Sequence, residues 1–177
     1  MKYTEWLQKN FDFDHDVALV TGGTSGIGMA YVKLLASQGC RCVVVSNEPE
    51  LFDDLQKQLV SQGLPPANFL FHDLSDSLAI TMLADTIRGL RIRILVNNAG
   101  IGIKGSFVEI EPGKYLEALS VNALAPTLIS HATLPHMLAE NRGLHICVSS
   151  INVISPIAKN AVYTATKHYI WSYALAI

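Results

Sequence analysis

The sequence predicts an α/β protein built on a doubly wound parallel sheet. Short apolar segments of strand length alternate along the chain with longer segments of helical periodicity. A glycine-rich turn joins the first of these strands to the first crossover helix. The helical segments are long enough to connect parallel strands, which places helices on both faces of the sheet. These observations predict the strand order 3-2-1-4-5.

Composition favours one domain over residues 1–177, because half of the residues are hydrophobic and 16% are charged. No apolar run is longer than a strand, and the N-terminal residues mix charged and aromatic side chains. We therefore expect neither a membrane span nor a signal peptide. A formal net charge of −2 gives no electrostatic basis for binding nucleic acid. Cys40, Cys42 and Cys147 lie in or beside apolar strands, and their spacing fits no metal site, which favours reduced thiols and a cytoplasmic location.

The first half of the chain is expected to supply three strands and two crossover helices. The strands are expected at residues 17–20, 41–46 and 68–72, and the helices from about residue 27 to 39 and over 48–62. Apolar side chains at helical spacing predict the buried faces: Ile27, Tyr31, Leu34 and Leu35 in the first helix, and Leu51, Leu55 and Leu59 in the second. Residues 1–16 are expected to form a short helix or arm anchored by Trp6 and Leu7.

The second half is expected to continue the alternation with two more strands. A turn at residues 73–76 caps a helix over 77–89, and a fourth strand follows at 94–97. A long helical region over about 112–141, with bends near Pro126 and Pro135, leads to a fifth strand at 145–149. A last helix, which carries Tyr163 and Lys167, runs to the final residue.

The turn after the first strand has the glycines that a nucleotide site needs. Gly22 permits a tight turn, Gly26 lets the main chain approach a ligand, and Gly28 lets the helix pack closely on the strand. The free N–H groups at the helix start, together with the positive end of the helix dipole, suit a pyrophosphate. The sequence therefore predicts a dinucleotide-binding turn.

Five motifs together resemble the short-chain dehydrogenase/reductase family, in its order and approximate spacing. They are Thr21-Gly22-x-x-x-Gly26-Ile27-Gly28, Asn97-Asn98-Ala99-Gly100, Asn122, Ser150 and Tyr163-x-x-x-Lys167. The resemblance runs from about Asp16 to the C-terminus. It implies a Rossmann fold, an NAD(P)-dependent oxidoreductase acting on a small carbonyl or alcohol substrate, and a homodimer or homotetramer. The segments 30–31, 134–137 and 163–167 are also similar to reductases of steroid or long acyl ketones.

Tyr163 and Lys167 stand four residues apart, so their side chains project from one face of a helix. A phenol with a pKa of about 10 exchanges protons poorly near neutrality, and a nearby ammonium in a partly closed cleft favours the phenolate. The pair is thus expected to act as the general acid in reduction or the base in oxidation. The resemblance implies that Lys167 also holds the nicotinamide ribose.

Three further positions have roles that the resemblance implies. Ser150 stands thirteen residues before Tyr163 and would donate to the substrate oxygen, with Ser149 as the competing candidate. Asn122 would position a water that links Lys167 to solvent, while as a poor helix former it also predicts a local bend with its side chain bonded to backbone.

The resemblance also implies a set of cofactor contacts along the strand ends. Asp73 would accept from the adenine amino group, although a turn or cap role is equally open to it, whereas Asn97 is expected to stabilise the sheet. The full set is Gly22, Thr24, Ser25, Gly26, Ile27, Gly28, Ser46, Asn47, Asp73, Leu74, Asn98, Ala99, Gly100, Tyr163 and Lys167.

The choice between NAD and NADP is normally made at the end of the second strand. An acidic residue at position 46 would select NAD, and an arginine at position 47 would select NADP. This chain has Ser46 and Asn47 there, has Ser25 in place of a common basic residue, and has Glu48 one place late. These features favour NAD.

The family pattern continues beyond the point where this sequence stops, through two more strands and a substrate-covering segment. Its absence predicts a domain that is incomplete at the C-terminus and a fifth strand left as an apolar sheet edge. A second hypothesis is therefore a catalytically silent nucleotide-binding or assembly module.

Overall fold

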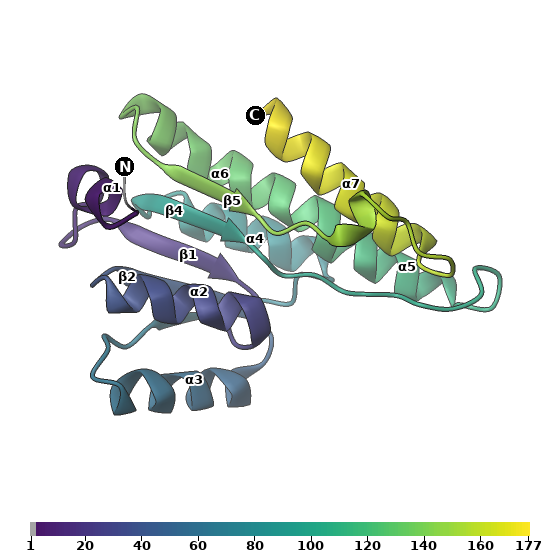
Figure 1. The fold of residues 1–177 in the computed structure, drawn as a ribbon, viewed down its shortest axis with the longest axis horizontal. Coiled ribbons are helices and arrows are strands. Elements are labelled where there is room, and N and C mark those ends of the chain that lie inside the picture. Colours follow the sequence, from purple (N-terminus) through teal and green to yellow (C-terminus); the bar gives the residue numbers. More distant parts are fainter. Residues whose placement is uncertain (1–2) are drawn as a thin grey trace.

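A five-stranded parallel sheet forms the centre of the molecule in the computed structural model, which describes residues 3–177 (Figure 1). The strands are β1 (Val17–Thr21), β2 (Arg41–Ser46), β3 (Asn68–Phe71), β4 (Ile92–Asn97) and β5 (Leu144–Cys147). Their order is β3-β2-β1-β4-β5, and every pairing is parallel. The predicted fold class and strand order are confirmed.

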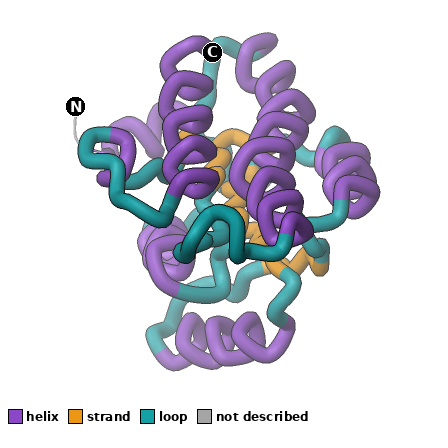
Figure 2. Tube along the Cα trace, turned by 90° about the vertical axis from the view of Figure 1, so that its right-hand side faces the viewer, coloured by secondary structure: helices purple, strands orange, loops and turns teal. Residues whose placement is uncertain are grey.

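Helices cover both faces of this sheet, as Figures 1 and 2 show. They are α1 (Tyr3–Asn10), α2 (Gly26–Ser37), α3 (Pro49–Ser61), α4 (Ser77–Ile87), α5 (Pro112–Leu119), α6 (Ala125–Ala139) and α7 (Ala161–Ala176). One apolar core lies between the sheet and α1, α2 and α3, and the other between the sheet and α4 and α6. Strand β1 supplies Ala18 and Val20 to the first core and Val17 and Leu19 to the second. Burial on both faces explains why the strands have continuous apolar runs.

The predicted buried face of α2 is right in part. Leu35 is buried and Tyr31 packs against the core as expected, but Ile27 and Leu34 are 60% and 48% exposed, and Val32 and Ala36 are buried in their place. The reason is the close packing of Gly28 on the preceding turn, where a Cβ would lie 2.1 Å from the carbonyl oxygen of Gly22. That contact fixes the rotation of the helix about its axis, so the stripe that includes Gly28 faces the sheet.

The face of α3 differs from prediction in the same way. Leu55 and Leu59 are buried as expected, but Leu51 is 39% exposed and Phe52 takes the core position. The Phe52 ring stacks on Phe69 of β3 with 4.4 Å between ring centroids. A large aromatic partner on the sheet therefore decides which of two adjacent apolar residues turns inward.

The expected long helix over residues 112–141 is interrupted before Pro126. A π-helical segment, Ser120–Leu124, separates α5 from α6. Pro126 lies in the first turn of α6, and Pro135 lies inside that helix. The N-terminal arm is the helix α1, in which Leu7 is buried as expected; residues 1 and 2 lie outside the described part.

A buried ion-pair network ties the opposite end of the sheet together. Asp16, directly before β1, is completely buried, and Arg93 in β4 is 1% exposed. Arg93 donates to Asp16 at 3.1 Å and to Glu140, after α6, at 2.8 Å, while Arg91 pairs with Asp16 at 3.2 Å. Burial alone would raise the pKa of Asp16, but the hydrogen bond from the Asp12 N–H and the contacts with Arg93 together lower it.

We expect Asp16→Asn to lower the free energy of unfolding by about 3–5 kcal/mol, because it leaves buried Arg93 without its anionic partner. Since the folded pKa of Asp16 is below the unfolded value, the pair stabilises the fold above about pH 4. That contribution is lost as the pH falls through the lowered folded value. Urea unfolding followed by tryptophan fluorescence across this range measures both effects.

The matched control is Asp85→Asn, because Asp85 forms an ion pair with Arg88 at 3.4 Å while 71% exposed. Exposed pairs contribute little, so this variant should unfold like the parent chain. Equal, small losses in both variants would show that the network does not stabilise the fold.

Candidate active site

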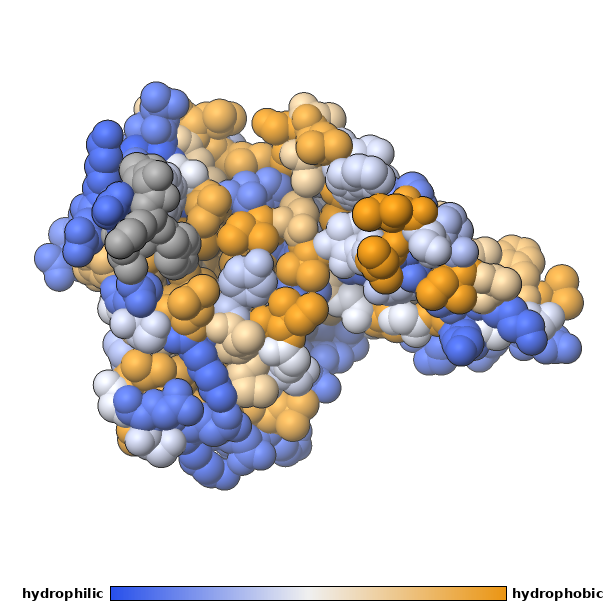
Figure 3. Space-filling view, in the orientation of Figure 1, coloured by the Kyte–Doolittle hydropathy of each residue, from blue (hydrophilic) through white to orange (hydrophobic). Residues whose placement is uncertain are grey.

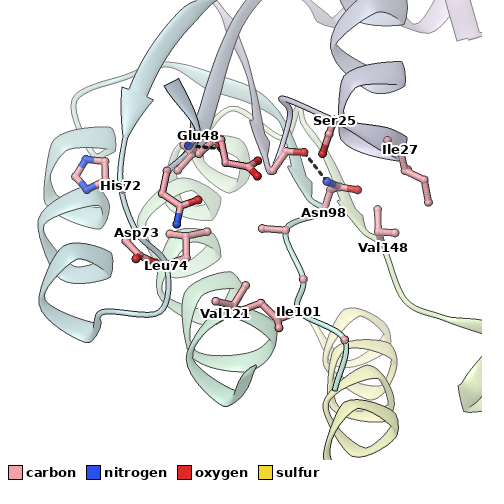
Figure 4. Close-up of a pocket in the computed structure, with 18 of the residues that line it drawn as sticks. Ser25, Ile27, Glu48, His72, Asp73, Leu74, Asn98, Ile101, Val121 and Val148 are labelled. Carbon is pink, nitrogen blue, oxygen red and sulfur yellow. Dashed lines mark hydrogen bonds between the residues drawn. The ribbon is translucent and has the colours of Figure 1, made fainter. Parts of the chain in front are cut away.

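A cavity of about 530 Å³ opens at the carboxyl edge of the sheet. It lies where the strand order reverses between β1 and β4, which is where ligands bind in doubly wound sheets. Figure 4 shows the side chains that reach it from the loops after β1, β2, β3, β4 and β5. Predicted residues that line it are Gly22, Ser25, Gly26, Ile27, Ser46, Asn47, Asp73, Leu74, Asn98, Ala99, Gly100, Tyr163 and Lys167.

The glycine turn forms one wall of this cavity. Gly22 and Gly26 have φ angles of +61° and +52°, a region that residues with a Cβ rarely adopt. Ser25 is the N-cap of α2, and its side chain makes no capping hydrogen bond. The first N–H groups of α2 are therefore not capped by Ser25, and such groups at a helix start suit an anion.

Asn98 holds the glycine turn against the loop after β4. Its Nδ2 donates to the carbonyl oxygens of Thr21 at 2.9 Å and Gly22 at 3.0 Å. In return, Thr21 Oγ1 accepts from the N–H groups of Asn98 and Ala99, each at 3.0 Å. The amide of Asn98 thus bonds to the protein main chain, and the buried hydroxyl of Thr21 is a structural partner that the sequence analysis did not single out.

Polar side chains at the ends of β2 and β3 form a second wall. Glu48 and Asp73 both line the cavity, and Thr24 lies behind Glu48, bonded to it at 3.0 Å. The Oδ1 atom of Asp73 accepts from the N–H of Ser75 at 2.9 Å. This bond is the main cause of the lowered pKa of Asp73, and Asn47 contributes a further side-chain hydrogen bond. Asp76, not Asp73, caps α4.

The side chains of Tyr163 and Lys167 reach the cavity together from α7. The Nζ atom of Lys167 lies 5.9 Å from the centroid of the Tyr163 ring and donates to the carbonyl oxygen of Val148 at 2.9 Å. Lys167 is 5% exposed, and this burial lowers its pKa. A Cβ on Gly100 would lie 3.1 Å from Nζ, so glycine there leaves the ammonium its space.

Asn122 lies in the π-helical segment and bonds to backbone, as predicted. Its Oδ1 accepts from the N–H of Ile101 at 2.8 Å, and its Nδ2 donates to the Ile101 carbonyl at 2.9 Å. A third bond, at 3.0 Å, reaches Thr166 of α7. The extra residue of the π turn lets one side chain join the loop after β4 to the helix that carries Lys167.

Ser149 and Ser150 face different partners. Ser149 lines the cavity, but its hydroxyl donates to the main-chain carbonyl of Lys167 at 3.0 Å. Ser150 caps the short helix Ile151–Val153, with its Oγ accepting from the N–H of Asn152 at 3.2 Å. The hydroxyl hydrogen of Ser150 is therefore not used by this bond.

Some predicted site residues are not among the residues that line the cavity. Thr24, Gly28, Asn122 and Ser150 are not among its lining residues and contact those that are, or shape the segments that carry them. The wall also contains residues that the sequence analysis missed: Val45, His72, Ile101, Gly102, Val121 and Val148. Most follow a strand end and could have been found by that rule. Val121 could not, because only the π turn brings it there.

Residues 16–176 match the family model described as short chain dehydrogenase, and the chain belongs to this family. It is 28% identical to dehydrogenase/reductase SDR family member 7B of Bos taurus, over 94% of this chain and 54% of that protein. It is 33% identical to a very-long-chain 3-oxoacyl-CoA reductase of Caenorhabditis elegans, over 86% of this chain and 51% of that protein. It is 27% identical to the human inactive hydroxysteroid dehydrogenase-like protein 1, over 90% of this chain and 49% of that protein. The chain thus spans about half the length of these relatives.

A solved structure agrees with the fold. A metagenomic short-chain oxidoreductase in complex with NADP superimposes with a TM-score of 0.82 and 34% identity. The match covers 91% of this chain and 74% of that one. Among residues 3–177, none of the helices has the length and hydropathy needed to cross a bilayer.

We expect Gly28→Ala to weaken dinucleotide binding strongly and to destabilise the fold by about 1–3 kcal/mol, because the new Cβ has no space against the Gly22 carbonyl. Titration with NADH, followed by its fluorescence, and thermal unfolding measure the two effects. Gly89→Ala is the control, since a Cβ there meets nothing within 4 Å. A Gly28→Ala protein that melts and binds like the control would contradict the assignment of this turn.

Proposed function

We propose that the protein is an NAD(P)-dependent oxidoreductase that transfers a hydride between nicotinamide and a carbonyl or alcohol carbon. The observation that carries this proposal is the single cavity that both the glycine turn and the pair Tyr163 and Lys167 line. Residues 1–177 act as one dinucleotide-binding and catalytic domain.

The residues present fit a dinucleotide. The backbone of Gly22 and Gly26 with the α2 N-terminus suits its pyrophosphate, and the tight fit of Gly28 keeps that N-terminus directly beside the turn. Asp73 and Leu74 would hold the adenine, while Ala99 and Gly100 would line a ribose. When bound, the nicotinamide ring supplies or accepts the hydride.

Tyr163 moves the proton in this proposal. Its phenol protonates the substrate oxygen in reduction and takes the proton back in oxidation. Lys167 stabilises the phenolate, because its ammonium is buried and donates only to the Val148 carbonyl among the described residues. A charge that is poorly solvated gains more from a nearby anion than one in open water.

Ser150, rather than Ser149, donates to the substrate oxygen. The Ser149 hydrogen is already committed to the Lys167 carbonyl, whereas the Ser150 bond to Asn152 uses only an oxygen lone pair. A hydroxyl with a free hydrogen can stabilise the negative charge that develops on that oxygen.

Asn122 is a positioning residue for a water relay to Lys167. Asn122 and Lys167 both line a second cavity of about 10 Å³, which is roughly the volume accessible to one water. Asn97 and Thr21 line the same cavity and offer further polar partners. A water there would exchange protons between Lys167 and its surroundings.

The substrate is an apolar ketone or alcohol. Ile151, Ile154 and Ile157, between β5 and α7, are 69%, 75% and 51% exposed. Figure 3 shows apolar residues grouped over this segment, beside the catalytic helix. Such a rim favours a hydrophobic substrate, as does the similarity to a very-long-chain 3-oxoacyl-CoA reductase.

The protein acts in the cytoplasm as a homodimer or homotetramer, which light scattering would measure. Exposed apolar side chains on α5 and α7 support association: Leu116 is 66% exposed, Trp171 44% and Leu175 76%.

A second candidate function is a silent dinucleotide-binding module. It is favoured by the similarity to a relative described as inactive. Titration with NADH followed by addition of a panel of apolar ketones separates the two, because a silent module binds NADH without oxidising it.

We expect Tyr163→Phe to reduce turnover by about 10²–10⁴-fold or more while cofactor binding is retained, because only the transferable proton is lost. NADH oxidation with a ketone measures turnover, and NADH fluorescence measures binding. Unchanged turnover in the variant would refute the role of Tyr163.

We expect Ser150→Ala to lower turnover by about 10²–10³-fold, the effect of losing one donor to a developing oxyanion. Ser149→Ala is the matched control on the adjacent residue and should cost less than about tenfold. The same assay compares them, and a larger loss in Ser149→Ala would reverse the assignment.

A further inference from the structure

A triangle of polar side chains joins β4, β5 and α6, and its members do not line the large cavity. Asn97 Nδ2 lies 2.9 Å from Ser130 Oγ and 3.0 Å from His145 Nε2. The Ser130 and His145 atoms are themselves 3.0 Å apart. Asn97 and Ser130 are buried, and His145 is half-buried. The imidazole of His145 thus has two polar partners inside the protein.

The hydrogens of this triangle follow from its donors and acceptors. The amide nitrogen of Asn97 carries two hydrogens, one for Ser130 and one for His145. The Nε2 atom of His145 must then accept, so the ring is neutral and carries its hydrogen on Nδ1. Burial lowers the pKa of His145, which agrees with a neutral ring near neutrality.

The other ionisable groups around His145 also favour a neutral ring. Cys147 Sγ, on the same strand, lies 3.5 Å from Nε2, and burial raises the pKa of this thiol. Tyr173 of α7 meets the imidazole edge to face, with 6.5 Å between ring centroids, and burial raises its pKa as well. Lys167 of α7 is close enough to act on the Cys147 thiol, and as a cation it disfavours a second positive charge nearby.

The oxygen of the Asn97 amide is left for the second cavity. Asn97 lines this cavity of about 10 Å³ together with Asn122 and Lys167. Since the amide nitrogen is committed to Ser130 and His145, the oxygen is the polar atom that remains. It is buried and accepts no hydrogen bond from the part of the chain that the structure describes. A buried acceptor without a partner, beside space for one water, indicates a water that donates to it.

The amide of Asn97 has a second possible arrangement. If Nε2 of His145 gains a proton it becomes a donor, and the Asn97 nitrogen can no longer donate to it. Rotation of the amide by a half-turn places its oxygen against Nε2 and turns its nitrogen toward the small cavity. The heavy atoms of the amide exchange places, so the change needs no new space. Protonation of one ring nitrogen therefore reverses the hydrogen-bond polarity that Asn97 presents to the water.

We propose that His145 and Asn97 are positioning residues for the relay to Lys167, and that the neutral imidazole keeps the Asn97 oxygen toward the relay water. This rests on the proposed function, in which that water exchanges protons with Lys167. A water that donates to Asn97 turns its lone pairs to the Lys167 ammonium, which can only donate. When the amide is rotated, two donors compete for those lone pairs and the relay slows.

The first test is an NMR titration of the 177-residue chain. Long-range proton–nitrogen spectra should show the His145 hydrogen on Nδ1 at pH 8, and the titration should give this ring a pKa below the usual value of about 6.5. The side-chain amide signals of Asn97 should shift with the same midpoint. A hydrogen on Nε2 at pH 8, or an Asn97 amide that ignores the titration, would overturn the inference whether or not the chain is active.

The second test is the pH profile of NADH oxidation with an apolar ketone. Turnover of the parent chain should fall as the pH drops through the His145 pKa, because the amide then rotates. His145→Gln accepts without titrating, so it should lose this step and stay within about twofold of the parent at pH 8. His145→Leu offers Asn97 no acceptor and should lower turnover at pH 8 by about tenfold with KM unchanged.

His136→Gln is the matched control. Its Nε2 atom also has a partner, the carbonyl oxygen of Arg88 at 2.9 Å, but His136 is exposed and lines neither cavity. This variant should keep the parent profile. If His145→Gln keeps the parent profile too, the inference is wrong and the proposed function stands. A parent chain that binds NADH without oxidising it contradicts the proposed function, and the NMR titration then decides the inference alone.

Discussion

The approach of Gly28 to the carbonyl oxygen of Gly22 is the contact on which the rest of the site depends. A Cβ at position 28 would stand 2.1 Å from that oxygen, so the helix can start directly against the end of β1 only with glycine there. This closeness turns α2 so that Val32 and Leu35 enter the core. It also leaves the helix N-terminus facing the cavity instead of a capping side chain. The absence of a side chain at position 28 thus determines both the packing of α2 and the position of its uncapped N-terminus.

The helix α7, which carries Tyr163 and Lys167, is tied to its neighbours by three polar bonds. Ser149 donates to the carbonyl of Lys167, Lys167 donates to the carbonyl of Val148, and Asn122 bonds Thr166. These bonds join α7 to the end of β5 and to the π turn at once. The bond from Lys167 Nζ to the Val148 carbonyl is what makes burial of the ammonium tolerable, because an unpaired buried charge is far more costly.

Strand order and the place of the cavity could be predicted from the sequence, because alternation of strands and helices leaves few topologies. The faces of α2 and α3 could be predicted only in part, since two apolar stripes one residue apart fit the same periodicity. Only tertiary contacts choose between them, Gly28 in one helix and Phe52 on Phe69 in the other. A bend at Asn122 could be predicted, but its backbone partner could not, because Ile101 lies 21 residues earlier in another loop. The bond from Thr24 to Glu48 could not be predicted either, because it joins the ends of two strands.

The charges of the cavity follow the chemistry proposed for it. Lys167 lies at the end where reduction of a ketone would build negative charge on oxygen, and the uncapped α2 N-terminus suits the doubly charged centre of a dinucleotide. Glu48 and Asp73 lie at the remaining end, where hydroxyl and amino groups of adenosine would donate. Reversing the ligand would put a pyridine ring and its ribose among the carboxylates and leave Tyr163 without a reacting partner. The three features that would bind the ligand would therefore also fix its direction.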